Sequence, residues 1–250
     1  MNLKTSNPAF SGNTYTGSAE RIGYGPAMTI AGTVNKTGIL LLLVLASAAW
    51  TWSRFYSEGA GSVGGFTMVG ALGGFVLAMV TIFKKEWAGV TAPLYALFEG
   101  LFLGSLSAVF EMRYPGIAIE SVALTFGTCF CLLLAYRSGM IRATEKFTMG
   151  IVAATGGIAL VYFASMLLGI FHIQIPGIFG SGPIGILFSV AVVIVAALNL
   201  ILDFAVIEEG AYRGLPKYME WYSAFGLIVT LVWLYLEIIR LLSKLRDDRR

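Results

Sequence analysis

Residues 147–202 read FTMGIVAATGGIALVYFASMLLGIFHIQIPGIFGSGPIGILFSVAVVIVAALNLIL and contain no Asp, Glu, Lys or Arg. A helix crosses the apolar core of a bilayer in about 20 residues, so this stretch is too long for a single crossing. Its middle, residues 172–183 (HIQIPGIFGSGP), is rich in Gly and Pro, which favour turns. The stretch therefore predicts two membrane-spanning helices joined by a turn, over residues 149–171 and 184–207.

The rest of the chain contains further apolar runs of similar length, each bounded by charged residues. They lie at residues 37–56, 62–83, 90–110, 117–136 and 219–242. The 250 residues are 57% hydrophobic and 12% charged, whereas a soluble domain carries about 25% charged residues. We therefore expect an all-α, polytopic membrane protein whose seven transmembrane helices form one bundle in the lipid bilayer.

The N-terminal segment differs in composition from the rest. Residues 1–33 are polar and rich in Ser, Thr, Asn and Gly, and they lack the apolar stretch of a cleaved signal peptide. We expect them to form a flexible tail ahead of a transmembrane domain at residues 34–250.

The distribution of basic residues predicts the orientation of the bundle, because cytoplasmic loops are enriched in Lys and Arg. The side of the N-terminus carries Lys4, Arg21, Lys36, Lys84, Lys85, Arg137, Arg142, Lys146, Arg213 and Lys217. The opposite side carries only Arg54 and Arg113, besides the basic C-terminus. The N-terminus is therefore expected in the cytoplasm. Either the last helix crosses completely and leaves a basic C-terminus outside, or it stops short of crossing.

Two pairs of glycines have the four-residue spacing that allows helices to approach closely in lipid. They are Gly70 with Gly74, and Gly100 with Gly104. We expect each pair to mark a close helix–helix contact.

Four carboxylates fall inside or at the rims of the predicted helices: Glu99, Asp203, Glu220 and Glu237. A charged residue in the membrane is costly, by at least about 2.5 kcal/mol for an Asp at the centre of a helix, and is often functional. Each of three also has a structural explanation. Glu99 could be hydrogen-bonded inside the bundle, Asp203 could be solvated near the membrane surface, and Glu237 could pair with Arg240. Glu208 and Glu209 are interpreted as loop residues in water.

The last predicted helix carries a polar stripe at near-heptad spacing. It consists of Glu220, Ser223, Thr230, Glu237 and Lys244. Such a stripe should not face lipid, so this helix is expected at the centre of the bundle.

The predicted depths spread the acidic residues across the membrane. Asp203 and Glu220 would lie near the cytoplasmic face, Glu99 near the middle, and Glu237 with Arg113 towards the far side. Spaced carboxylates suit the passage of cations or protons, with carboxylate–guanidinium pairs as closures. Our hypothesis is that these residues line one water-filled route along the last helix.

Three segments resemble the Bax inhibitor-1 (transmembrane Bax-inhibitor-motif) family, especially its bacterial branch. They are ALFEG at residues 96–100, LNLILDFAVIEEG at 198–210, and PKYMEWYSAFGLIVTLVWLYLEIIRLL at 216–242. The resemblance covers roughly residues 35–245. It implies seven helices with the last one central and, for a bacterial protein, a place in the plasma (inner) membrane.

The resemblance also implies a pH-sensitive calcium leak governed by one carboxylate on each of the last two helices. Asp203 fits the first. Family spacing places the second near Leu227, which is not acidic, so Glu220 and Glu237 remain the alternatives. Asp203 with Glu220 is our candidate calcium site. The alternative function implied by the family is a non-enzymatic regulator that binds a membrane-bound AAA protease of the FtsH type.

Other classes of function have less support in the sequence. The basic residues are scattered among short loops, which does not indicate nucleic-acid binding. A single histidine and two cysteines, Cys129 and Cys131, do not form a transition-metal motif. His172 and Ser181 have no third, orienting group at useful depth, so we expect no enzyme and no cofactor beyond calcium.

Overall fold

A computed structural model describes residues 26–171 and 177–248 of the chain. Seven long helices occupy these residues: α2 (Ile30–Glu58), α3 (Gly64–Phe83), α4 (Ala88–Arg113), α5 (Ile117–Arg137), α6 (Glu145–Ile170), α7 (Pro183–Tyr212) and α8 (Met219–Asp248). Short 3₁₀ turns, η2 (Ala60–Ser62) and η3 (Lys85–Trp87), lie before and after α3. Each helix, η3 being counted with α4, is long and apolar enough to cross a membrane. The predicted all-α, seven-helix fold is confirmed.

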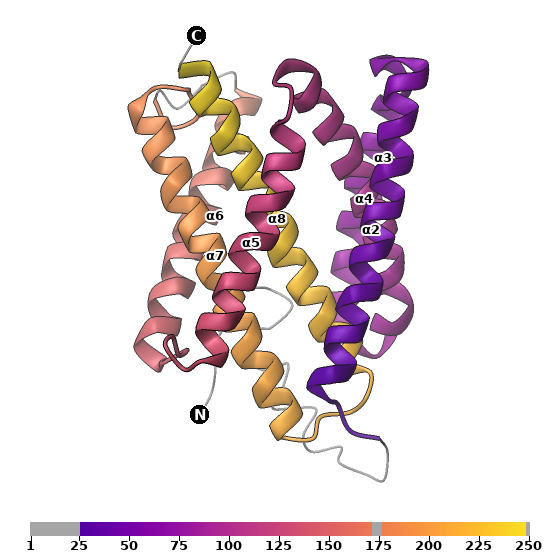
Figure 1. Cartoon of the computed structure of the whole chain (residues 1–250), viewed down its shortest axis with the longest axis vertical. Helices are drawn as coiled ribbons and strands as arrows, with labels where there is room; N and C mark the ends of the chain where they lie inside the picture. The colour runs from indigo at the N-terminus through magenta and orange to yellow at the C-terminus, as the bar shows by residue number, and fades with distance from the viewer. Residues whose placement is uncertain (1–25, 172–176, 249–250) are drawn as a thin grey trace.

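The helices form two groups on either side of α5 and α8 (Figure 1). On one side α4 packs against both α2 and α3, and on the other side α7 packs against α6. Helix α8 runs between the groups and contacts α2, α4, α5 and α7. The bundle is therefore organised around its last helix.

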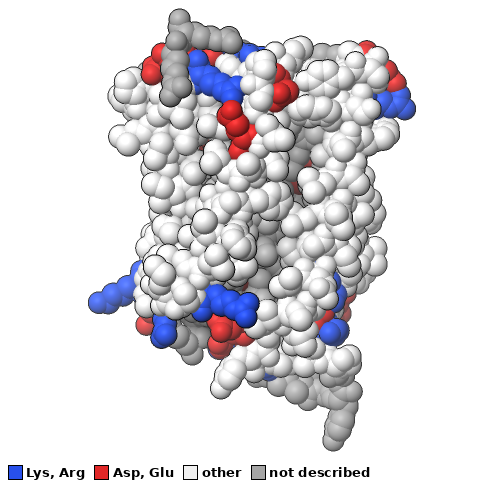
Figure 2. All heavy atoms as spheres, viewed as in Figure 1, with Lys and Arg blue, Asp and Glu red and all other residues white. Residues whose placement is uncertain are grey.

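The burial of the helices agrees with this arrangement. In its most apolar 18-residue window α8 is 61% buried, whereas α6 is only 6% buried. In the face drawn in Figure 2 the charged side chains gather at the two ends, and an uncharged belt lies between them. An uncharged belt facing outward is typical of a protein surrounded by lipid. The predicted central position of the last helix is confirmed.

Both glycine pairs lie at helix–helix contacts. A Cβ added to Gly70 would come within 2.7 Å of the Phe98 carbonyl oxygen on α4. A Cβ added to Gly104 would come within 2.3 Å of the Ala48 carbonyl oxygen on α2. Because both neighbours are backbone atoms, only a residue without a side chain allows this approach. The predicted close packing is confirmed.

Several helices extend beyond the predicted apolar runs. Helix α2 begins at Ile30 because Thr29 caps it, its side chain accepting a hydrogen bond of 3.0 Å from Gly32 N–H. Lys36 therefore lies inside this helix. Helix α7 continues to Tyr212, so the prediction that Glu208 and Glu209 are loop residues is wrong.

The last turns of α7 are stabilised by an ion pair and a hydrogen bond, which a hydropathy pattern cannot predict. Glu209 forms an i,i+4 ion pair of 2.5 Å with Arg213, and Glu208 accepts a hydrogen bond from Tyr136 on α5. Charged residues at the end of a transmembrane helix can stay helical because their heads reach the interface.

Helix α8 crosses the whole bundle. Arg246 donates a 2.7 Å hydrogen bond to the Pro115 carbonyl oxygen, in the connection between α4 and α5. Glu220 at the other end of α8 contacts the start of α2. The two ends of α8 thus lie at opposite ends of the bundle, as expected for a last helix that crosses completely.

Candidate functional site

The polar stripe of α8 is enclosed by protein along its whole length. Its five residues are exposed by 5% or less: Glu220, Ser223, Thr230, Glu237 and Lys244. The stripe therefore faces neighbouring helices and not lipid, as its spacing predicts. Its two carboxylates, Glu220 and Glu237, contact different helices, so the stripe makes two separate polar networks.

The first network joins Glu220 to the start of α2. The Glu220 carboxylate is 0% exposed and accepts hydrogen bonds of 2.9 Å from both the backbone N–H and the hydroxyl of Thr29. Lys217 forms an ion pair with it at 2.7 Å, and Lys36 forms a second ion pair. A carboxylate at a helix N-terminus is also favoured by the helix dipole.

Gly32 makes room for this arrangement. A Cβ at Gly32 would lie 2.1 Å from Oε1 of Glu220 and 2.4 Å from its Oε2. Glu220 thus occupies the space beside the first turn of α2. Its partners hold the first and last helices of the bundle together.

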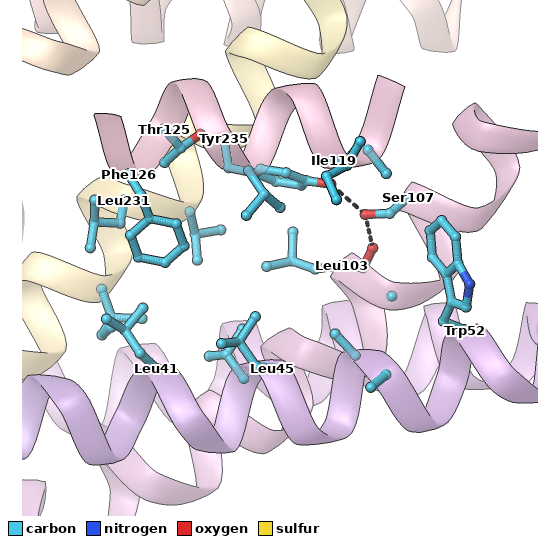
Figure 3. A pocket seen from close by; sticks show the side chains of 18 residues that line it. Leu41, Leu45, Trp52, Leu103, Ser107, Ile119, Thr125, Phe126, Leu231 and Tyr235 are labelled. Atoms are coloured by element: carbon cyan, nitrogen blue, oxygen red, sulfur yellow. Dashed lines mark hydrogen bonds between the residues drawn. The ribbon is translucent and has the colours of Figure 1, made fainter. Parts of the chain in front are cut away.

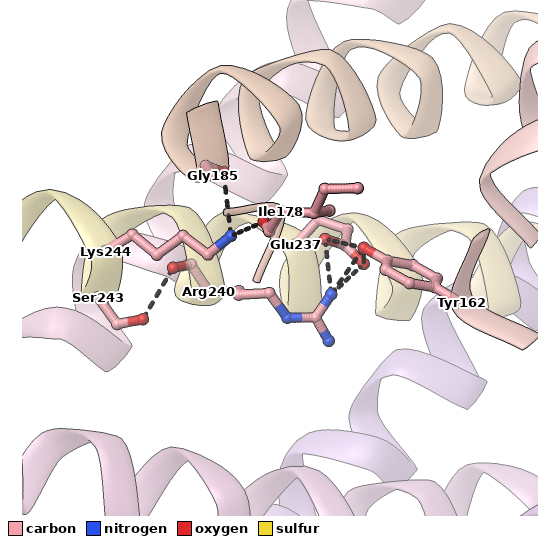
Figure 4. A network of polar contacts seen from close by, with 7 residues as sticks. All are labelled: Tyr162, Ile178, Gly185, Glu237, Arg240, Ser243 and Lys244. Carbon is pink, nitrogen blue, oxygen red and sulfur yellow. Dashed lines mark hydrogen bonds and ion pairs between the residues drawn. The ribbon is translucent and has the colours of Figure 1, made fainter. Parts of the chain in front are cut away.

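The second network joins Glu237 to α6 (Figure 4). The Tyr162 hydroxyl donates to the Glu237 carboxylate at 3.0 Å. Arg240, one turn further along α8, donates to the carboxylate at 2.9 Å and to the Tyr162 hydroxyl at 2.8 Å. The local pairing of Glu237 with Arg240, one of the two sequence interpretations, is therefore present and is extended by a tyrosine from another helix.

Lys244 forms the far end of the stripe and is 5% exposed. It donates to the carbonyl oxygens of Ile178 and Gly185, at 3.2 and 3.0 Å (Figure 4). These carbonyls belong to the connection between α6 and α7 and to the first turn of α7. A buried ammonium is thereby satisfied by backbone dipoles.

Asp203 lies deeper in the bundle than the sequence predicts. It is 0% exposed, and every residue from Asn199 to Ile207 on α7 is buried. Because α7 continues to Tyr212, Asp203 lies about 13 Å from the end of the helix at 1.5 Å per residue. A solvated position near the membrane surface is therefore excluded. One turn away, Asn199 donates to the Thr155 hydroxyl on α6 at 2.9 Å.

Glu99 and Arg113 on α4 lie apart from both networks. Glu99 is partly buried against α3, where a Cβ at Gly74 would lie 3.0 Å from its Oε2, and it interacts with the Tyr95 hydroxyl. The Arg113 side chain is 66% exposed and pairs with Asp247 at 3.4 Å. The structure thus does not bring Arg113 to Glu237, and Glu99, Glu220 and Glu237 have separate partners.

Comparison with protein families gives a match that covers most of this chain. The model described as Bax inhibitor 1 like matches residues 7–247. The chain belongs to the Bax inhibitor 1 like family. Neither the curated proteins nor the solved structures contain a match. The residues that match the family model therefore include both polar networks and almost all of the seven helices.

An apolar groove of about 450 Å³ lies beside α8 in this Bax inhibitor 1 like bundle (Figure 3). Helices α2, α4, α5 and α8 line it, with residues such as Leu45, Phe126 and Leu231. Its main polar contact is the 2.6 Å hydrogen bond between Ser107 and Tyr235. None of the five predicted pathway residues is among the residues that line the groove.

The family resemblance implies a calcium site. Calcium prefers six to eight oxygen ligands. Within residues 26–171 and 177–248, no group of three or more His, Cys, Asp or Glu is placed to hold a metal ion. The oxygens of Glu220 already contact two ammonium groups and Thr29. A resident calcium ion shared by Asp203 and Glu220 does not fit this conformation.

The partners of the carboxylates were largely missed by sequence analysis. Tyr162, Lys36 and Lys217 were not singled out as partners, and Thr29 and Gly32 fell in the predicted tail. The signal was present for Lys217, which lies three residues before Glu220, a spacing at which oppositely charged side chains can pair. Nothing in the local sequence around Tyr162 on α6 or Lys36 on α2 identifies α8 as the neighbour.

Proposed function

We propose that this Bax inhibitor 1 like protein is a non-enzymatic cation leak channel with calcium as its cargo, and that Asp203 is the carboxylate that receives the ion. The observation that carries the proposal is an aspartate with 0% exposure on a membrane-spanning helix enclosed by protein. Such a residue weakens insertion of its helix, so a functional role accounts for its presence. We further propose that the protein lies in the inner membrane of a bacterium with its N-terminus in the cytoplasm.

In this proposal the two polar networks of α8 keep the channel closed. Glu220 attaches α8 to α2 at one end, and Glu237 attaches it to α6 at the other. For ions to pass beside α8, at least one attachment must separate, which moves a carboxylate from its protein partners to water or to the ion. Protons compete with calcium for the same carboxylates, which would give a leak sensitive to pH.

The test is calcium flux into liposomes that contain the purified full chain and an internal calcium dye. Asp203→Asn keeps the shape of the side chain and removes its charge. Losing a charged ligand costs roughly 1.5–3 kcal/mol, so flux should fall about tenfold or more. Glu208→Gln is the matched control, because it removes a carboxylate from the same helix at an exposed position. Wild-type flux in Asp203→Asn would refute the proposal.

The alternative is regulation of a membrane-bound AAA protease through the N-terminal tail. Its supporting observation is that the end of the tail is attached to the bundle beside α8. Met28 is 2% exposed and its N–H donates to the Leu215 carbonyl oxygen at 2.6 Å. A deletion must therefore stop before this contact, at residue 25. Loss of protease regulation with unchanged flux in the deletion of residues 2–25 would favour the alternative for the tail.

A further inference from the structure

Three lysines from different parts of the chain meet the first turn of α8. Lys36 from α2 and Lys217 from the connection before α8 both pair with Glu220. Lys85 from η3 lies with its Nζ 5.8 Å from the centre of the Tyr222 ring. Segments far apart in the sequence thus place three ammonium groups at one end of the bundle. We call this set the lysine cluster.

The lysine cluster has more positive charge than its acidic neighbours balance. Glu220 contributes one negative charge, and Glu86, which follows Lys85 in the chain, contributes a second. Lys84, which precedes Lys85 and is exposed, adds a further ammonium group. Four ammonium groups against two carboxylates leave a net charge of about +2. Lys217 keeps its side chain 47% exposed, and an ammonium group has three N–H donors, of which Glu220 uses only part.

The position of the lysine cluster matches the headgroup layer of a membrane. It lies at the end of the bundle where α3 passes into α4 and α7 into α8. Trp87 in η3 is 60% exposed, and the Lys36 ammonium lies 5.5 Å from the centre of the Trp221 ring. Tryptophans are enriched at the membrane–water interface, where their rings lie at headgroup level.

We propose that the lysine cluster binds the headgroup phosphate of an anionic phospholipid. A phosphodiester carries one negative charge, which complements the residual charge of the cluster. Basic recesses between transmembrane helices bind such headgroups. Lys217 and Lys85, which lies beside Tyr222 in the first turn of α8, supply the donors, while Glu220 keeps its contacts with Lys36 and Thr29. The bound lipid would then strengthen the attachment of α8 to α2, whether or not the protein conducts ions.

The test titrates the purified full chain, in a neutral detergent, with phosphatidylglycerol and counts bound lipid by native mass spectrometry. A basic residue near an anionic headgroup contributes about 1 kcal/mol, so Lys217→Gln should lower the affinity about fivefold. Lys85→Gln should lower it similarly and does not touch Glu220, which separates lipid binding from misfolding. Lys217→Arg should bind as the wild type does. Lys146→Gln removes an exposed charge at the start of α6, at the same end of the bundle, and should have no effect.

Two further measurements distinguish an anionic lipid from other ligands. Phosphatidylcholine, which has no net charge, should bind at least about fivefold more weakly than phosphatidylglycerol. Inorganic phosphate in solution should not displace the lipid, and displacement would assign the site to a free anion. Unchanged binding in Lys217→Gln and Lys85→Gln overturns the proposal. An equal loss in Lys146→Gln also overturns it, because attraction would then come from the whole charged face.

Discussion

Replacing Gly104 by alanine tests the close contact of α2 with α4. The added Cβ would lie 2.3 Å from the Ala48 carbonyl oxygen and 2.7 Å from its Cα. Ordinary contacts between non-bonded atoms begin near 3.5 Å, so the two helices must move apart by roughly 1 Å. Neither neighbour can rotate away, because both are backbone atoms. Overpacking of this kind costs about 1–3 kcal/mol.

Gly127 on α5 provides the matched control. It is exposed, and a Cβ there meets no atom of the described residues within 4 Å. Alanine at this position only removes the helix penalty of glycine, which is about 0.5–1 kcal/mol. The two substitutions have the same chemistry and should have opposite effects on the free energy of unfolding.

The assay is thermal unfolding of the purified variants in a mild detergent, followed by circular dichroism. In a chain of this size 1 kcal/mol shifts the Tm by about 2–4 °C. Gly104→Ala should therefore lower the Tm by roughly 2–12 °C, and Gly127→Ala should raise it slightly. The reasoning is refuted if Gly104→Ala unfolds at or above the temperature of Gly127→Ala.

The polar networks of α8 give three further predictions, each measured by the same unfolding assay. Gly32→Ala displaces Glu220 from its space beside α2 and should destabilise the fold by about 1–3 kcal/mol; a wild-type Tm would contradict this. Arg240→Met leaves Glu237, which is 2% exposed, without its cation. The free energy of unfolding should fall by roughly 1–3 kcal/mol. This is less than the roughly 3–5 kcal/mol for breaking a fully buried pair, because the Arg240 side chain is 41% exposed. Tyr162→Phe removes hydrogen bonds but no charge, so it should lower the free energy of unfolding by only about 1 kcal/mol. A larger loss of stability in Tyr162→Phe than in Arg240→Met would contradict this prediction.

The fold could be predicted from the sequence because each helix leaves its own local signal. An apolar run of about 20 residues specifies a crossing without reference to the rest of the chain. The break near Pro183 and the polar stripe of α8 are equally local. The ends of helices were predicted less well, as at Glu208 and Glu209, because tertiary partners such as Tyr136 hold them helical.

The site could be predicted only in part. The carboxylates are visible in the sequence because charge is rare in this chain, but their neighbours are set by three-dimensional packing. Asp203 is as buried as a functional carboxylate should be, whereas a single wet route through Glu99, Glu220 and Glu237 was an extrapolation from depth alone. Residues predicted at a similar depth need not meet, because Arg113 pairs with Asp247, ten residues beyond Glu237 on α8.

The contact of Glu220 with Thr29 also has a consequence for biogenesis. The two residues are 191 positions apart, and the chain is made from its N-terminus. Helices α2 to α7 are therefore synthesised before α8, and until α8 is inserted the space that it occupies between them has no helix in it. Insertion of the last helix completes assembly in one late step. Nascent chains truncated before this step would present polar faces to lipid, which makes them natural targets for quality control.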